Sequence, residues 1–287
     1  EVKPAIIIAV PLVIEKIIRK KVFPKLLNNR MRLLLNMPIV SRKVNEKIRE
    51  QVVNAFGGKF YEIIVGGAAF NQEVEQFLKR IEFPYTVGYG ATECAPIICY
   101  ADYQEFVAGS CGKPVVHMEV KIDSPDPENV PGEILARGLN VMLGYYKNEE
   151  ATAQTLDKEG WYHTGDLGLM DADGNVFIKG RSKNMLLGAS GQNIYPEEIE
   201  DKLNSLAMVN ECIVVQRGEK LVGLVYPDFD EAATMRLNDS DLEKIMEENR
   251  QELNATQPPY CRLSAIEIVK EEFEKTPKKS IKRYLYK

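Results

Sequence analysis

The chain has 287 residues, 45% hydrophobic and 28% charged, a composition ordinary for a globular protein. Its formal net charge of −5 argues against general nucleic-acid binding, which needs a basic surface. No apolar run approaches the roughly 20 residues that a transmembrane helix requires. The chain opens on Glu1, with neither an initiator methionine nor a signal-peptide pattern, which predicts a piece of a longer protein.

The first part of the chain alternates between strand and helix patterns. Residues 5–10 form an Ile-rich run that predicts a buried strand, and residues 12–21 follow with helical spacing. Ser41 is the predicted cap of a helix through about Phe56. The alternation continues with a strand at residues 60–65, a helix capped by Asn71 and a strand at residues 84–88. This order predicts a largely parallel sheet covered by helices.

From Gly112 onward the pattern changes to short strands separated by turn signals. They are expected at residues 115–122, 132–137, 163–170 and 176–180, as in a small barrel or β-subdomain. The acidic stretch at residues 171–175 fits either a calcium loop or a tight hairpin with Gly174 at positive φ. The rest of a calcium loop, including its twelfth-position Glu, is missing, so we predict the hairpin.

The pattern of short strands and turns ends around residues 181–183. The following segment predicts a compact α+β unit with strands at residues 184–187, 212–216, 220–226 and 264–269 and helices at residues 196–206 and 239–253. We place the domain boundary at Lys183, which gives domains of residues 1–182 and 183–287.

Five cysteines, without a Cys-x-x-Cys pair or metal-ligand spacing, are typical of reduced thiols in a cytoplasmic protein. Residues 16–32 combine seven cationic side chains with apolar ones. This composition fits peripheral contact with the anionic inner membrane surface, but a solvated helix face is the interpretation that we favour. The sequence leaves that choice and the oligomeric state open.

Several short motifs follow one another along the chain. They are Gly-Gly-Ala-Ala at residues 66–69, Tyr-Gly-Ala-Thr-Glu at 89–93, Trp-Tyr-His-Thr-Gly-Asp at 161–166, Gly-Arg-Ser-Lys at 180–183 and Ser-Gly-Gln-Asn at 190–193. Their order and spacing resemble the adenylate-forming superfamily, and the resemblance covers nearly the whole chain. It implies an α/β fold: the C-terminal part of a large N-domain, with a parallel-type sheet, helices and a small β-subdomain, followed by a small mobile α+β domain.

The first two motifs suit a nucleotide. Gly67, Ala68 and Ala69 lack bulk, so their backbone can approach a planar ligand closely, although a strand–turn–helix junction would also explain them. The resemblance implies that these residues bind the adenine of ATP or AMP. It also implies that Tyr89, followed by Gly90, stacks on the adenine.

Phosphate, ribose and metal contacts are also implied by the resemblance. Thr92 would donate a hydrogen bond to the α-phosphate, and Glu93 would hold Mg²⁺, which prefers a carboxylate together with substrate phosphate. Asp166 would accept the ribose hydroxyls, and Arg181 would contact ribose or phosphate. The matching elements at residues 132–133, 137–138 and 144–146 are expected to be structural.

Two further positions concern the second half-reaction that the resemblance implies, in which a thiol attacks the acyl-adenylate. The resemblance places the hinge between the domains at Lys183, where a backbone rotation would swing the small domain. It places Gly191 in a loop along the thiol channel, where a residue without a side chain lets the pantetheine arm of coenzyme A pass.

The sequence departs from the family pattern at two places. No Ser/Thr/Gly-rich phosphate loop precedes residues 66–69, so we expect these 287 residues to be inactive by themselves. In the tail, Ser280 stands where the family keeps a lysine that contacts the reacting carboxylate and the α-phosphate. Lys282 lies two residues further on and Lys279 one residue before, and either can take that role.

The opening Val-Pro-x-x-x-Glu-Lys-Ile at residues 10–17 looks like the corresponding segment of long-chain fatty acyl-CoA synthetases. The expected substrates are therefore a long-chain fatty acid, ATP with Mg²⁺, and coenzyme A. One alternative is a ligase that stops at the acyl-adenylate or loads a carrier protein. Another, of a different class, is a non-catalytic fragment that binds nucleotide or acyl chains.

Overall fold

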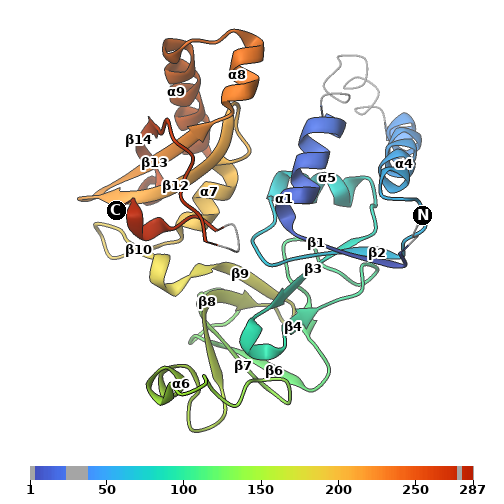
Figure 1. Cartoon of the computed structure of the whole chain (residues 1–287), viewed down its shortest axis with the longest axis vertical. Helices are drawn as coiled ribbons and strands as arrows, with labels where there is room; N and C mark the ends of the chain where they lie inside the picture. The colour runs from blue at the N-terminus through green and yellow to red at the C-terminus, as the bar shows by residue number, and fades with distance from the viewer. Residues whose placement is uncertain (1–3, 24–37, 277–279, 287) are drawn as a thin grey trace. The chain divides into compact units, whose positions relative to one another are not determined.

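The computed structural model describes residues 4–23, 38–276 and 280–286 (Figure 1). The chain divides into two compact units, Glu1–Ile178 and Lys179–Lys287, and each has apolar clusters of its own. All five cysteines are free, and four of them are buried. Among the described residues, no helix has both the length and the apolar character needed to cross a membrane.

In the described part of the first unit, one sheet has the strand order β1-β2-β3-β4-β5. The strands are β1 (Ile6–Ala9), β2 (Glu62–Gly66), β3 (Tyr85–Gly90), β4 (Ile97–Tyr100) and β5 (Lys113–Pro114). The first three are parallel, whereas β4 and β5 join antiparallel. The predicted parallel sheet is therefore confirmed, with an antiparallel extension.

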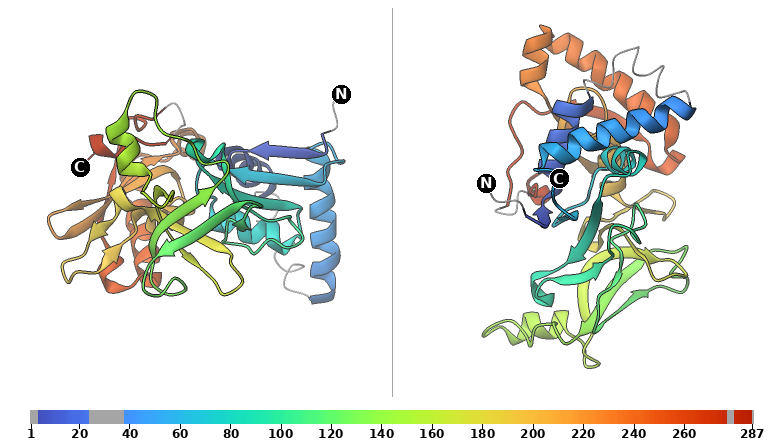
Figure 2. Two further views of the ribbon diagram at one scale, coloured as in Figure 1. Left: turned by 90° about the horizontal axis from the view of Figure 1, so that it is seen from below. Right: turned by 90° about the vertical axis from the view of Figure 1, so that its right-hand side faces the viewer.

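Helices pack on the parallel strands through one buried apolar cluster (Figures 1 and 2). They are α1 (Pro11–Ile17), which continues into the π-helical turn η1 (Ile18–Val22), α4 (Pro38–Ala55) and α5 (Gln72–Arg80). Asn71 caps α5 as predicted, because its side chain accepts a hydrogen bond of 3.2 Å from the Val74 N–H. The predicted start at Ser41 is wrong. The helix α4 begins at Pro38, a residue type that suits a first turn because no N–H is needed there.

A second sheet in the first unit is open and has the order β6-β7-β8-β9 in the part that the structure describes, so the β-subdomain alternative is right and the barrel is wrong. Its strands are β6 (Met118–Asp123), β7 (Gly132–Gly138), β8 (Tyr162–Met170) and β9 (Val176–Arg181). The predicted hairpin joins β8 to β9, with Gly174 at φ +85°. The Asp171 carboxylate accepts backbone hydrogen bonds within this turn. A short helix, α6 (Glu149–Thr155), was not predicted.

The second unit is built on a three-stranded sheet, β12-β13-β14, packed against α7 and α9 within the described residues. Its elements are η3 (Ser182–Asn184), β10 (Leu186–Leu187), β11 (Asn193–Ile194), α7 (Pro196–Leu203), β12 (Val209–Arg217), β13 (Lys220–Pro227), α8 (Phe229–Met235), α9 (Asp239–Thr256), η4 (Pro259–Cys261), β14 (Leu263–Ile268) and η5 (Arg283–Leu285). The strand expected at residues 184–187 is shorter than predicted, because a 3₁₀ turn takes up its start and only Leu186 and Leu187 pair.

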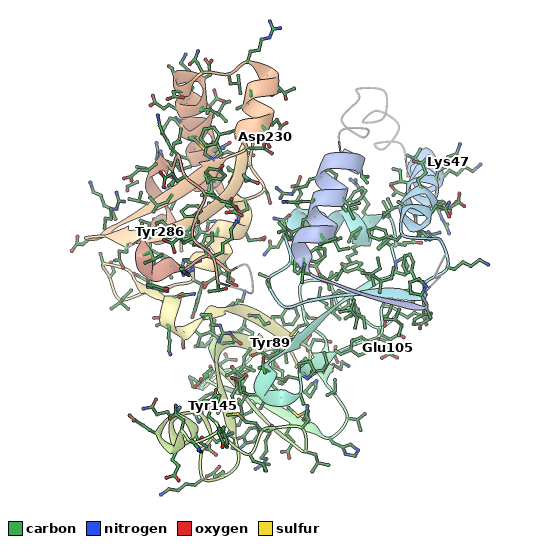
Figure 3. All side chains as sticks on the ribbon, in the orientation of Figure 1. Lys47, Tyr89, Glu105, Tyr145, Asp230 and Tyr286 are labelled. Atoms are coloured by element: carbon green, nitrogen blue, oxygen red, sulfur yellow. The ribbon has the colours of Figure 1, made fainter. Side chains whose placement is uncertain are left out.

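Beyond β14, residues 274–276 pair with residues 280–282, and we call these two segments the tail hairpin. Lys275 pairs with Ile281, and the Lys282 N–H donates to the Glu274 carbonyl at 2.8 Å. Outside the hairpin, Phe273 is only 3% exposed, and its ring lies edge-on to that of Tyr286 with 5.0 Å between centroids. Tyr286 is labelled in Figure 3. Arg283 forms an ion pair with the buried carboxylate of Glu200 in α7. The hairpin is therefore fastened to the sheet and to α7.

Candidate active site

Two of the predicted motifs begin at the same edge of the parallel sheet. Gly66 at the end of β2 lies opposite Gly88 in β3, so the residues that follow both strands emerge at the carboxyl edge. Gly67 has φ +92°, a backbone conformation that favours glycine. Residues 67–69 are exposed, and this edge is where open α/β sheets bind ligands. The structure thus brings the predicted adenine loop beside the Tyr-Gly-Ala-Thr-Glu motif.

Tyr89 and Asp166, separated by 77 residues in sequence, are hydrogen bonded in the first unit. The Tyr89 hydroxyl donates to Oδ2 of Asp166 at 2.7 Å. Tyr89 is 7% exposed, and burial, reinforced by the Asp166 charge, raises the pKa of its hydroxyl. The hydroxyl therefore remains protonated and acts as a donor. The predicted adenine-stacking residue and the predicted ribose acceptor lie side by side.

Glu133 fixes the chain leading to Asp166. Its Oε1 accepts the Gly165 N–H at 2.9 Å, and its Oε2 lies 2.9 Å from Nδ1 of His163. The Asp166 N–H donates to Oγ1 of Thr164 at 3.0 Å. Glu133 therefore positions the Thr-Gly-Asp segment of β8, in agreement with its expected structural role.

Glu93 lies in the 3₁₀ turn η2 (Thr92–Cys94), directly after β3. Thr92 is exposed and Glu93 half-buried. The Tyr145 hydroxyl donates to Oε1 of Glu93 at 2.8 Å, and burial together with Glu93 raises the pKa of Tyr145. Sequence reasoning missed this partner, since only the fold brings residue 145 to residue 93.

The donor chemistry at Glu93 fits a magnesium ion. Mg²⁺ is commonly bound through one or two carboxylates together with substrate phosphates rather than by a complete protein cage. Among the described residues, no group of three or more His, Cys, Asp or Glu side chains could hold a metal by themselves. A single carboxylate, preceded by the predicted phosphate donor Thr92, is compatible with such a metal–nucleotide complex.

The other predicted residues of this set lie in the second unit. Arg181 ends β9, and Lys183 is exposed in η3. Gly191 has φ +82° in the turn between β10 and β11, and the space beside its Cα is open. These positions suit their expected roles sterically, and the roles themselves stay predictions.

In the tail, the structure describes one of the two candidate lysines. Nζ of Lys282 lies 3.1 Å from Oε2 of Glu274, across the tail hairpin. Lys279 is outside the described residues. Of the cationic segment at residues 16–32, the described Arg19 lies 3.5 Å from Glu73 of α5, and most of the segment is likewise outside the described part.

Loops at the carboxyl edge of a parallel sheet, followed by a separate α+β unit, match the architecture that the resemblance to adenylate-forming enzymes implies. The chain belongs to the AMP-binding enzyme family. The family model of that description matches residues 1–146, and the model of the AMP-binding enzyme C-terminal domain matches residues 183–286.

Individual relatives are similar over part of their length. The chain is 36% identical to 4-coumarate–CoA ligase 5 of Oryza sativa subsp. japonica over 191 residues, 62% of this chain and 35% of that protein. It is 40% identical to a long-chain-fatty-acid–CoA ligase of Escherichia coli O157:H7 over 156 residues, 52% and 28% of the two chains. The solved anthranilate CoA ligase AuaEII, in complex with anthranoyl-AMP, shares the fold at a TM-score of 0.71 and 22% identity, over 98% of this chain and 49% of that one.

Proposed function

We propose that the protein, at full length, joins a long-chain fatty acid to coenzyme A at the expense of ATP, giving acyl-CoA, AMP and pyrophosphate. The observation that carries this proposal is the Tyr89–Asp166 hydrogen bond, because it unites two motifs expected to bind the nucleotide. The 40% identity to a long-chain-fatty-acid–CoA ligase supports the choice of acid.

In the first half-reaction, an oxygen of the fatty-acid carboxylate attacks the α-phosphorus of ATP and pyrophosphate leaves. Residues 67–69 and Tyr89 hold the adenine, Asp166 and Arg181 hold the ribose side, and Thr92 donates to the α-phosphate. Glu93 would hold Mg²⁺, which when bound neutralises charge on the phosphates. Lys282 or Lys279 supplies a cation near the transferred group. Positioning and charge stabilisation, rather than covalent catalysis, accelerate this step.

In the second half-reaction, the thiol of coenzyme A attacks the acyl carbonyl carbon and AMP leaves. We assign this step to a rotation of residues 183–287 against residues 1–182 about Lys183, with Gly191 lining the thiol path. Two observations support a boundary in this region. The contacts divide after Ile178, and the C-terminal family model begins at residue 183. A cytoplasmic location and membrane contact through residues 16–32 stay predictions.

Aromatic acids are the second candidate substrate class, because 4-coumarate–CoA ligases are similar over a larger share of this chain. The test is AMP release by the full-length protein with fatty acids of graded length and with 4-coumarate, each with and without coenzyme A. We expect fatty-acid-dependent AMP release and a thioester that forms only with coenzyme A. Preference for 4-coumarate would overturn the choice of acid. AMP release without any thioester would overturn coenzyme A as acceptor.

A further inference from the structure

We propose that Tyr145 is a positioning residue that orients the Glu93 carboxylate for the magnesium–nucleotide complex. This inference rests on the proposed function, in which Glu93 is the metal ligand. The Tyr145 hydroxyl donates to Oε1 of Glu93 at 2.8 Å across 52 residues of sequence. Its bond occupies one face of the carboxylate and so selects one orientation of the group.

The main chain around Glu93 is already fixed by other contacts from the segment at residues 138–145. The Met142 N–H donates to the Glu93 carbonyl at 2.7 Å. The Asn140 amide donates to the carbonyls of Cys94 and Ile97 at 2.6 and 3.0 Å. These bonds hold the backbone of the 3₁₀ turn, whereas the Tyr145 hydroxyl contacts the carboxylate itself.

Tyr145 is itself held in place. Its N–H donates to Oγ1 of Thr152 in α6 at 2.9 Å, and that hydroxyl donates to the Asn148 carbonyl at 2.8 Å. The preceding Gly144 has φ +146°, and a Cβ there would lie 2.8 Å from Cγ2 of Thr152. The first turn of α6 therefore fixes the position of the Tyr145 backbone, from which the phenol extends.

An oriented carboxylate matters more for Mg²⁺ than for most cations. Mg²⁺ demands near-ideal octahedral geometry, so a ligand that can rotate loses part of its affinity. Hydrogen-bond donors behind a metal-binding carboxylate typically account for about ten- to hundredfold in metal affinity.

The test compares Tyr145→Phe with Tyr146→Phe in the full-length protein. Tyr146 is the neighbouring residue, 88% exposed, with Lys147 over its ring at 5.3 Å, so the same atom is removed one residue away. Binding of Mn²⁺ as a paramagnetic probe is measured by electron paramagnetic resonance with a non-hydrolysable ATP analogue. AMP binding without metal is measured by calorimetry. We expect about tenfold weaker Mn²⁺ binding in Tyr145→Phe only, with unchanged AMP affinity.

A Glu93→Gln variant separates this inference from the proposed function. If Glu93→Gln binds Mn²⁺ as the wild type does, Glu93 is not the ligand and both fail. If Glu93→Gln weakens the metal and Tyr145→Phe does not, only the positioning role is overturned. An equal loss of metal-free AMP binding in Tyr145→Phe would assign the residue to general stability and would also overturn the inference.

Discussion

We call the site around Tyr89, Glu93 and Asp166 in the first unit the nucleotide edge, after its proposed ligand. This edge and the tail hairpin of the second unit hold their predicted functional side chains in different ways. At the nucleotide edge, Asp166 accepts a hydrogen bond from Tyr89, which lies 77 residues away in sequence. Glu93 accepts one from Tyr145, which lies 52 residues away. In the tail, the partner of Lys282 is Glu274, eight residues away in the same hairpin. The side chains of this tail pair are 30% and 65% exposed.

The difference separates a preorganised site from an adjustable one. The long-range hydrogen bonds exist only when two sheets and their loops are folded, so they fix Asp166 and Glu93 before any ligand arrives. An exposed ion pair is worth only about 0–1 kcal/mol, so Lys282 can leave Glu274 for a phosphate at little cost. Substitutions at the nucleotide edge should therefore disturb binding geometry, and substitutions in the tail should disturb one step of the reaction.

The largest effect should follow Glu93→Ala in the full-length protein. Loss of a metal-positioning charge should lower adenylation on the order of a hundredfold or more, measured as fatty-acid-dependent ATP–pyrophosphate exchange. Glu105→Ala removes an exposed acid of the same unit and should leave exchange unchanged. Near-wild-type exchange in Glu93→Ala would remove that residue from the mechanism.

In the tail, Lys282→Ala should lower ATP–pyrophosphate exchange on the order of thirtyfold, and Lys279→Ala should lower it less. Ser280 and Lys282 flank Ile281, whose backbone pairs with Lys275, so their side chains share one face of the hairpin strand. Thioester formation from preformed acyl-adenylate should change much less. A larger defect in Lys279→Ala would reverse the assignment of the catalytic cation.

A smaller and more selective effect is expected for Lys183→Pro. Proline fixes φ, which should resist the proposed rotation and slow thioester formation about tenfold while exchange continues. The two half-reactions are measured separately, with acyl-adenylate supplied for the second. Equal losses in both would mean that Lys183 is not the pivot.

The smallest effect concerns Tyr89→Phe. Removing the donor to Asp166 should weaken AMP binding about three- to tenfold by calorimetry, since only one hydrogen bond is lost and the aromatic ring is kept. Tyr85→Phe is the matched control, because its hydroxyl lies on the same strand and faces the Glu75 carbonyl at 3.4 Å. Similar losses in both variants would show a general packing defect in β3 instead of a role for the Tyr89–Asp166 bond.

Local signals in the sequence predicted much of the fold. Asn71 marked the start of α5, and Gly174 marked the turn before β9, because each acts through its own backbone neighbourhood. Helix α6 was missed although Asn148 and the following acids form a capping signal, since a helix of seven residues leaves little periodicity to detect. The extent of the strand expected at residues 184–187 was predicted poorly, because a strand of two paired residues has almost no alternation of apolar and polar positions.

The site was predicted as a set of motifs but not as a set of contacts. The sequence placed Tyr89, Glu93 and Asp166 in motifs that match a known family. The tyrosine donors to Asp166 and Glu93 depend on sheet register and on the path of residues 138–145, which no local pattern encodes. Tyr145 was accordingly expected to be structural.

The buried carboxylate of Glu200, which pairs with Arg283 of the tail, makes stability depend on pH. Burial raises the pKa of Glu200 from 4.5 to about 7, although Arg283 and the Val214 N–H act in the opposite direction. Relative to the unfolded chain, the stability from this group is fully present below pH 4.5 and is lost as pH rises toward about 7. Because the Arg283 charge lowers this pKa, it favours the ionised form of the buried carboxylate. Arg283 is thus the counter-ion that partly offsets the cost of burying the Glu200 carboxylate.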